Sequence, residues 1–82
     1  MNVYARKFAA ACPNNGEQII YSLRIETDGR MIQVEHITTA TALIKEGFHE
    51  QIADQLFARF GGKQTLTAHH HGVDIETVRG EA

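Results

Sequence analysis

The 82-residue chain contains a single cysteine, a single proline, one serine and no tryptophan. One cysteine cannot form an internal disulfide, so we expect a reducing, cytoplasmic compartment. No stretch approaches the ~18 apolar residues of a membrane-spanning helix, and residues 1–7 lack the apolar core of a signal peptide. Ser22, the only serine, lies in the middle of a predicted strand, which argues against a Ser-His-Asp triad.

A basic surface is also missing, because 8 lysines and arginines stand against 10 aspartates and glutamates, giving a net charge of −2. A protein that binds nucleic acid through phosphates needs a basic stripe, so we expect no nucleic-acid partner. The sequence has no Gly-x-Gly-x-x-Gly, no phosphate-binding Gly-Lys-Ser/Thr and no His-Glu-x-x-His. The remaining composition, 43% hydrophobic and 22% charged, is typical of one globular domain spanning residues 1–82.

Four segments are predicted as strands: Val3–Cys12, Ile19–Thr27, Gln64–Ala68 and Val73–Arg79. The second is the clearest, because the apolar side chains of Ile19, Tyr21, Leu23 and Ile25 all point one way. Asp28-Gly29 predicts a tight turn after it, and Met31–Glu35 is expected to continue as extended chain. In the first strand, Tyr4, Phe8 and Cys12 would share one face.

Two helices are predicted between the second and third strands. The hydroxyl of Thr38 or Thr39 would cap the first, which would bury Ala40, Leu43 and Ile44 and end at Gly47. The second would begin near Phe48 and end at Gly61-Gly62. Its apolar side recurs at helical spacing and comprises Phe48, Ile52, Ala53, Leu56, Phe57 and Phe60.

The element order is therefore β-β-α-α-β-β, an α+β fold with both helices on one face of an antiparallel sheet. The other face would carry Ser22, Arg24, Glu26, Asp74 and Glu76. Such a polar face suits either a solvated sheet face or the inside of a water-filled barrel, which four strands cannot close alone. We therefore expect a homo-oligomer whose copies pair their edge strands and close the barrel.

Cys12 lies where the first strand meets a tight loop, Pro13-Asn14-Asn15-Gly16. A thiol there can face a ligand, but it needs a nearby cation or dipole to act as a nucleophile. The alternative is a small buried apolar side chain, which is common for free cysteine.

Phe48-His49-Glu50 opens the second predicted helix. His49 falls within the apolar side, as either a hydrogen-bonded core histidine or a proton-transfer group. Glu50 lies at the flank, where a half-buried carboxylate could hold an N–H-rich heterocycle. Its other explanation is the helix dipole, which favours acidic residues in the first turn.

His69, His70 and His71 precede Gly72 in a predicted turn. On a strand, His69 and His71 would share a face and could form a zinc site with Cys12. A solvated turn is the alternative, and we predict no metal among the site residues.

The Cys12-Pro13-x-x-Gly16 loop and Phe48-His49-Glu50, on this element order, resemble the tunnelling-fold (T-fold) superfamily. The similarity is greatest to 7-cyano-7-deazaguanine reductase of queuosine biosynthesis, and more distant to GTP cyclohydrolase I and 6-pyruvoyl-tetrahydropterin synthase. The resemblance implies Cys12 as the nucleophile toward a nitrile and His49 as its proton-transfer partner. Glu50 would anchor a purine-, deazapurine- or pterin-type ring at a subunit interface.

Two departures from the reductase pattern bear on activity. Ile19 stands where the reductase has a proton-donating aspartate. NADPH is the cofactor that the resemblance implies, but its lysine-containing motif is absent from Met31–Leu43, which leaves the cofactor open. The alternatives are a non-catalytic T-fold binding or assembly module, and a zinc-dependent enzyme of the cyclohydrolase or pterin-synthase type.

Overall fold

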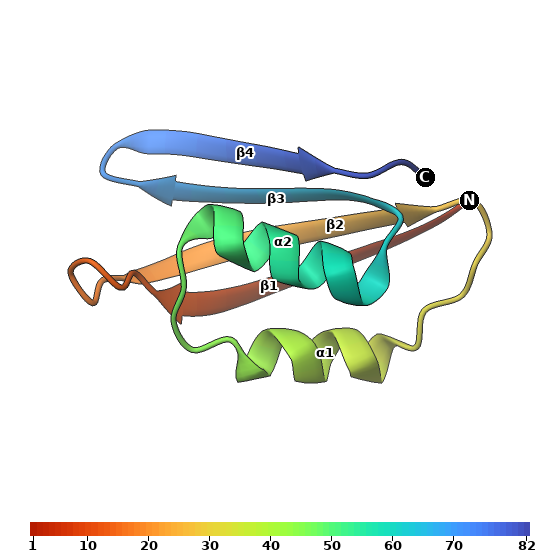
Figure 1. Cartoon of the computed structure of the whole chain (residues 1–82), viewed down its shortest axis with the longest axis horizontal. Coiled ribbons are helices and arrows are strands. Elements are labelled where there is room, and N and C mark those ends of the chain that lie inside the picture. The colour runs from red at the N-terminus through yellow and green to blue at the C-terminus, as the bar shows by residue number, and fades with distance from the viewer.

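Four antiparallel strands form one sheet, and two helices cover one of its faces (Figure 1). The computed structural model describes all 82 residues. The elements are β1 (Asn2–Ala11), β2 (Gln18–Thr27), α1 (Val34–Leu43), α2 (His49–Phe60), β3 (Lys63–His70) and β4 (Val73–Arg79). The sheet order follows the chain, β1-β2-β3-β4. The predicted α+β class and β-β-α-α-β-β order are confirmed.

The side chains of the sheet alternate between the helix-covered face and an open face. In β2, Ile19, Tyr21, Leu23 and Ile25 are buried, whereas Ile20 is 62% exposed. The register places Tyr21 opposite Phe8 of β1 and opposite Ala68 of β3. The Phe8 and Tyr21 rings stack with centroids 5.3 Å apart, which adds an aromatic cross-strand pair to the buried face.

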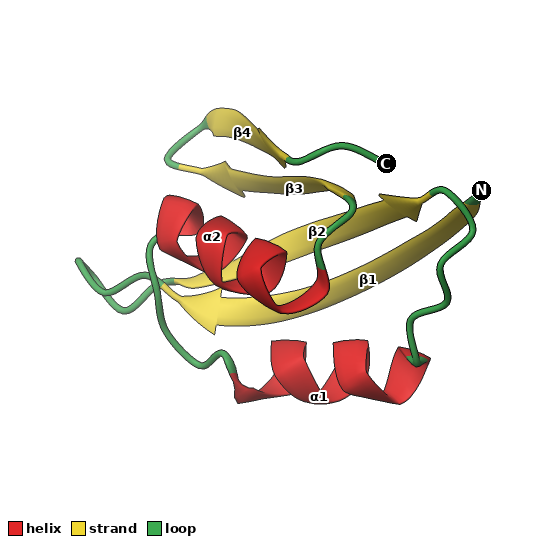
Figure 2. Ribbon diagram, turned by 45° about the vertical axis from the view of Figure 1, so that its right-hand side comes forward, coloured by secondary structure: helices red, strands yellow, loops and turns green.

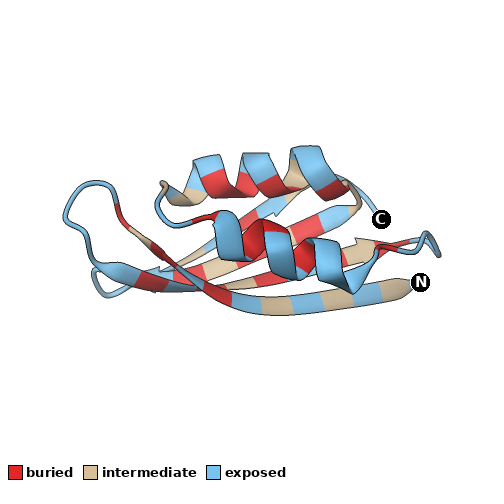
Figure 3. Cartoon of the chain, turned by 90° about the horizontal axis from the view of Figure 1, so that it is seen from below, coloured by how far each residue is buried: buried red, intermediate tan, exposed pale blue.

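The core lies between the sheet and the helices (Figure 3). α2 contributes Ile52, Ala53, Leu56 and Phe60, which are buried at the predicted helical spacing. The helix ends at Gly61, whose N–H donates to the Phe57 carbonyl, as the glycine pair predicted.

The prediction for Met31–Glu35 is wrong, because α1 already begins at Val34 and no strand partner exists for the preceding residues. Ile32 is instead buried as an anchor, and its N–H donates to the Tyr4 hydroxyl at 3.0 Å. The chain must cross from the end of β2 to the helix layer, so this segment forms a connection.

The predicted cap of α1 is also wrong. Gln33 occupies the cap position without a side-chain hydrogen bond, and Thr38 and Thr39 lie inside the helix. The helix ends at Leu43 rather than near Gly47, and Leu43 is 71% exposed instead of buried. Thr41 takes the buried position, since its hydroxyl donates back to the Ile37 carbonyl at 2.8 Å.

The turn between the last two strands is shorter than predicted. His69 and His70 belong to β3 and pair with Asp74 and Val73 of β4. Only His71 and Gly72 form the turn, both with positive φ. A two-residue turn of this kind matches the twist of the flanking strands.

β1 and β4 are the outer strands of the sheet, and its open face carries no helix (Figure 2). A concavity on this face is lined by Ser22, His69, Asp74 and Glu76, among others. Closure of a barrel through β1 and β4 of neighbouring copies stays a prediction. Neither helix has the length and apolar character needed to cross a membrane.

Candidate functional site

Cys12 follows directly after β1, at the start of a closed loop. Its N–H donates to the Glu17 carbonyl at 2.8 Å, and its own carbonyl accepts from Gly16 N–H at 2.8 Å. These two bonds fix the backbone around the thiol. The side chain is buried, on the same face of the sheet as Phe8.

The segment before α2 brings the helix to Cys12. Ala11 N–H donates to the Lys45 carbonyl at 2.9 Å, and Gly47 N–H donates to the Ala11 carbonyl at 3.2 Å. This short parallel bridge joins the end of β1 to the residues that precede Phe48 and His49. The Cys-Pro loop and the Phe-His-Glu motif, which are distant in the sequence, therefore lie close together within a single copy of the chain.

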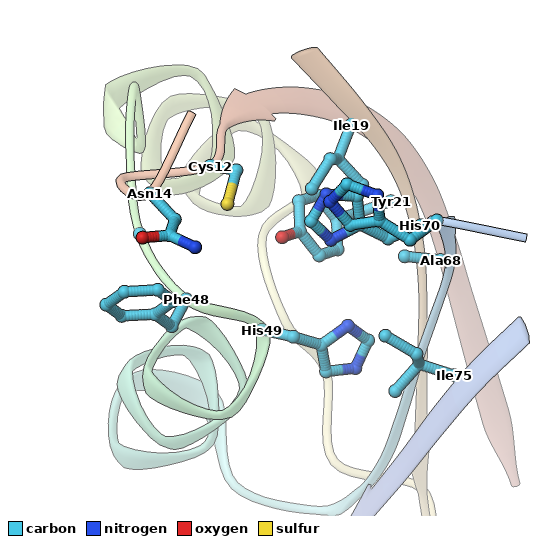
Figure 4. A pocket seen from close by; sticks show the side chains of 11 residues that line it. Cys12, Asn14, Ile19, Tyr21, Phe48, His49, Ala68, His70 and Ile75 are labelled. Carbon is cyan, nitrogen blue, oxygen red and sulfur yellow. The ribbon is translucent and has the colours of Figure 1, made fainter. Parts of the chain in front are cut away.

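A cavity of about 230 Å³ opens between them, which we call the Cys12 cavity (Figure 4). Its walls come from the Cys12 loop, the start of α2 and strands β2, β3 and β4. They consist of Cys12, Asn14, Ile19, Tyr21, Gly47, Phe48, His49, Ala68, His70, His71 and Ile75. Two of the three predicted site residues, Cys12 and His49, thus line one cavity.

Tyr21 is a site residue that the sequence did not reveal. Its alternation pattern marks only a core position, and the ring is 1% exposed. Its hydroxyl oxygen nevertheless points into the Cys12 cavity, on the side of the thiol (Figure 4). Burial, and secondarily the charge of a Cys12 thiolate, raise the pKa of Tyr21, so it remains a protonated hydrogen-bond donor.

His49 is held in one tautomer by the neighbouring strand. Nε2 lies 3.1 Å from the Leu66 carbonyl oxygen of β3. A carbonyl can only accept, so Nε2 carries the proton and Nδ1 presents its lone pair. Nδ1 is buried without a hydrogen-bond partner. His49 thus lines the cavity and keeps an unpartnered basic nitrogen, and the centroids of its ring and the Tyr21 ring are 5.5 Å apart.

Burial lowers the pKa of His49 below its usual value of 6.5, against smaller raising effects of the Leu66 carbonyl and Glu50, while Arg79 adds a small lowering effect. The unfolded chain therefore binds a proton before the folded one does. We expect the free energy of unfolding to fall as the pH drops from about 6.5 through the lowered pKa of His49. Denaturant unfolding measured at several pH values in this range should show this fall in the free energy of unfolding for the wild type, and no such fall for His49→Gln. An identical fall in both proteins would contradict the assignment.

Glu50 is not half-buried, contrary to the prediction. Its side chain is 73% exposed and does not line the Cys12 cavity. The two carboxylate oxygens face β4, with Oε2 3.2 Å from Arg79 Nη2 and Oε1 3.5 Å from the Thr77 hydroxyl. The first residues of a helix project in different directions, so His49 turns inward while Glu50 faces the edge strand.

The segment Met31–Leu43, in which the resemblance places the NADPH motif of the reductase, contains no lysine or arginine. This segment contains the whole of α1, and Glu35 is its only side chain among aspartate, glutamate, lysine and arginine. Phosphates are bound by lysine, arginine or convergent N–H groups, and this segment has neither basic residue. Ile19, in the position of the reductase aspartate, is 5% exposed and forms an apolar part of the cavity wall.

The zinc ligands suggested by the sequence do not come together. His71 and Cys12 line the Cys12 cavity, but His69 lies on the open face and its Nδ1 pairs with Asp74 Oδ1 at 2.8 Å. The expected alternation of His69 and His71 fails because the strand ends at His70.

No protein-family model and no curated protein matches the chain. Among solved structures, the crystal structure of the archaeosine synthase QueF-Like in the apo form is similar, with a TM-score of 0.71 and 19% sequence identity. The match covers 98% of this chain and 91% of that one. The chain thus has the T-fold that its Cys-Pro loop and Phe-His-Glu motif indicated.

Proposed function

We propose that this chain is an enzyme-like T-fold protein that binds a flat purine- or deazapurine-type ring in the Cys12 cavity, where Cys12 adds to a nitrile carbon of the ligand. The observation that carries the proposal is that one cavity is lined by both the buried Cys12 and by His49, whose Nδ1 has no hydrogen-bond partner. The similar solved structure is named a synthase, which favours an enzyme over an assembly module.

The size and lining of the cavity suit a single flat ring. Its 230 Å³ is below the ~300–1,000 Å³ of common small-molecule pockets, which leaves space for a ring system without a large substituent. Ile19, Ala68 and Ile75 offer apolar contact, and Phe48, 49% exposed, adds an aromatic ring to the wall. Asn14, Tyr21 and His49 are the polar groups that would orient the heterocycle.

The chemistry needs no oxidant or reductant. The Cys12 sulfur forms a bond with the nitrile carbon while one π bond of the nitrile breaks. The thiol proton passes to His49 Nδ1 and from there to the nitrile nitrogen, which gives a thioimidate. The Tyr21 hydroxyl would donate a hydrogen bond to the nitrile nitrogen as it becomes the nitrogen of the thioimidate. All atoms of the ligand remain in the adduct.

Glu50 enters this proposal only through a second copy of the chain. Its carboxylate lies beside β4, the outer strand through which copies would pair. In a ligand that lies between two copies, N–H groups of the ring could bind the Glu50 carboxylate in place of its present partners, Arg79 and Thr77. Anchoring by Glu50 therefore depends on the predicted homo-oligomer.

One observation favours a second candidate, a binding module without turnover. The apolar side chain of Ile19 stands in the cavity wall where a proton-donating carboxylate would serve a complete reaction. In that case the ring binds, but no bond to sulfur forms.

Mass spectrometry of the intact protein after incubation with 7-cyano-7-deazaguanine tests the proposal. We expect a mass increase equal to the whole ligand, located at Cys12 and absent from Cys12→Ser. The same heterocycle without its nitrile should bind, as measured by calorimetry, without mass change. Binding of the nitrile ligand with no adduct would support the module, and absence of any binding would remove both functions.

A further inference from the structure

We infer that Glu17, His70 and His71 form a binding site for a divalent transition metal of the zinc class at the wall of the Cys12 cavity. One ligand atom from each of these side chains lies within 4.8 Å of the others. No residue of this cluster serves the nitrile addition described above, so the two proposals can fail separately.

The backbone brings the three side chains together from the end of the Cys12 loop and from the turn between β3 and β4. Glu17 closes the Cys12 loop through its carbonyl, and the Asn15 side chain accepts from its N–H at 3.0 Å. His70 is the last residue of β3, and His71 follows with φ 53°. Residues other than glycine seldom adopt this left-handed conformation, and it interrupts the strand alternation so that both rings stay on one side. Their centroids are 4.2 Å apart.

His70 supplies the second, independent observation. Its Nε2 is buried and makes no hydrogen bond, although Glu17 Oε2 lies 3.4 Å away. A buried polar nitrogen without a partner is unfavourable, and a metal ion between the imidazole and the carboxylate would satisfy both. The His71 Nε2 is 3.3 Å from the Asn15 amide, a weak contact that can be exchanged.

The donor set selects the class of metal. Two imidazole nitrogens and one carboxylate oxygen are the ligands of three-residue zinc sites, which keep a fourth position open. Calcium and magnesium prefer oxygen ligands, so they fit this cluster poorly. Because His70 and His71 also line the Cys12 cavity, a metal held there could act on whatever the cavity binds.

Metal titrations of the metal-free protein test the inference. We expect one equivalent of Zn²⁺ to bind in competition with a chromophoric chelator, and Co²⁺ to give a spectrum without a thiolate charge-transfer band. Saturating Zn²⁺ should raise the melting temperature by about 10 °C or more. His71→Asn keeps a residue that tolerates positive φ, and it should weaken Zn²⁺ binding by more than about 100-fold, because even outer-shell partners contribute 10–100-fold.

Three further variants define the ligand set. Glu17→Gln should weaken binding in the same way as His71→Asn, whereas His69→Ala and Cys12→Ser should leave the Zn²⁺ affinity unchanged. Unfolding curves without metal establish that each variant is folded. The inference is overturned if the wild type binds no Zn²⁺, if His71→Asn binds it as tightly as the wild type, or if Cys12→Ser abolishes binding.

Discussion

Replacing His49 with glutamine is expected to slow formation of the Cys12 adduct by about 10²–10⁴-fold, the usual contribution of a positioned general acid-base group. The glutamine amide can still donate to the Leu66 carbonyl, so the local hydrogen bond of His49 is preserved. What is lost is the basic Nδ1, which has no other partner in the protein. The rate is measured by mass spectrometry at a fixed nitrile concentration.

His36→Gln is the matched control, because His36 is exposed on α1, outside the Cys12 cavity. Its adduct rate should equal that of the wild type. Calorimetry with the heterocycle that lacks the nitrile separates binding from chemistry, and His49→Gln should retain most of that affinity. An adduct rate in His49→Gln within a few-fold of the wild-type rate would show that another group accepts the thiol proton.

Leu56→Ala is expected to cause the largest loss of stability, about 2–5 kcal/mol. Leu56 is 1% exposed and lies on the face of α2 that packs against the sheet. Removal of its branched end leaves a cavity in a thin core that has few neighbouring side chains able to fill it. For a domain of this size the melting temperature should fall by about 10–30 °C.

Leu43→Ala is the matched substitution on the other helix. Leu43 is 71% exposed at the end of α1, so the change should be within about 0.5 kcal/mol of zero. Thermal unfolding followed by circular dichroism measures both variants. Equal effects of the two substitutions would mean that the assignment of the buried face is wrong.

Leu56 holds α2 on the sheet, and the first residue of the same helix is His49. The bridge between Ala11 and residues 45–47 fixes the other side of the cavity. The position of His49 thus depends on helix packing and on a short backbone bridge.

The amino-acid sequence by itself determined the four strands, the second helix and most of their buried faces, although Val73 and Phe48, both predicted on apolar faces, are 58% and 49% exposed. The reason is that side chains alternate in a strand and recur every 3.6 residues in a helix, so burial leaves a local periodic record. Ile19 to Ile25 and Ile52 to Phe60 carry that record plainly, and the structure buries them as predicted. The Cys-Pro loop and Phe-His-Glu motif indicated the T-fold, which the structural comparison confirms.

Only the tertiary structure decided how the functional groups meet. The cavity that joins Cys12 to His49, the inward hydroxyl of Tyr21 and the outward turn of Glu50 all depend on packing between distant segments. The start of α1 was misjudged because Met31–Glu35 contains alternating apolar residues but has no strand to pair with. The grouping of Glu17 with His70 and His71 follows from one left-handed residue at a turn. Such features arise from contacts between residues far apart in the chain, and local periodicity records nothing about them.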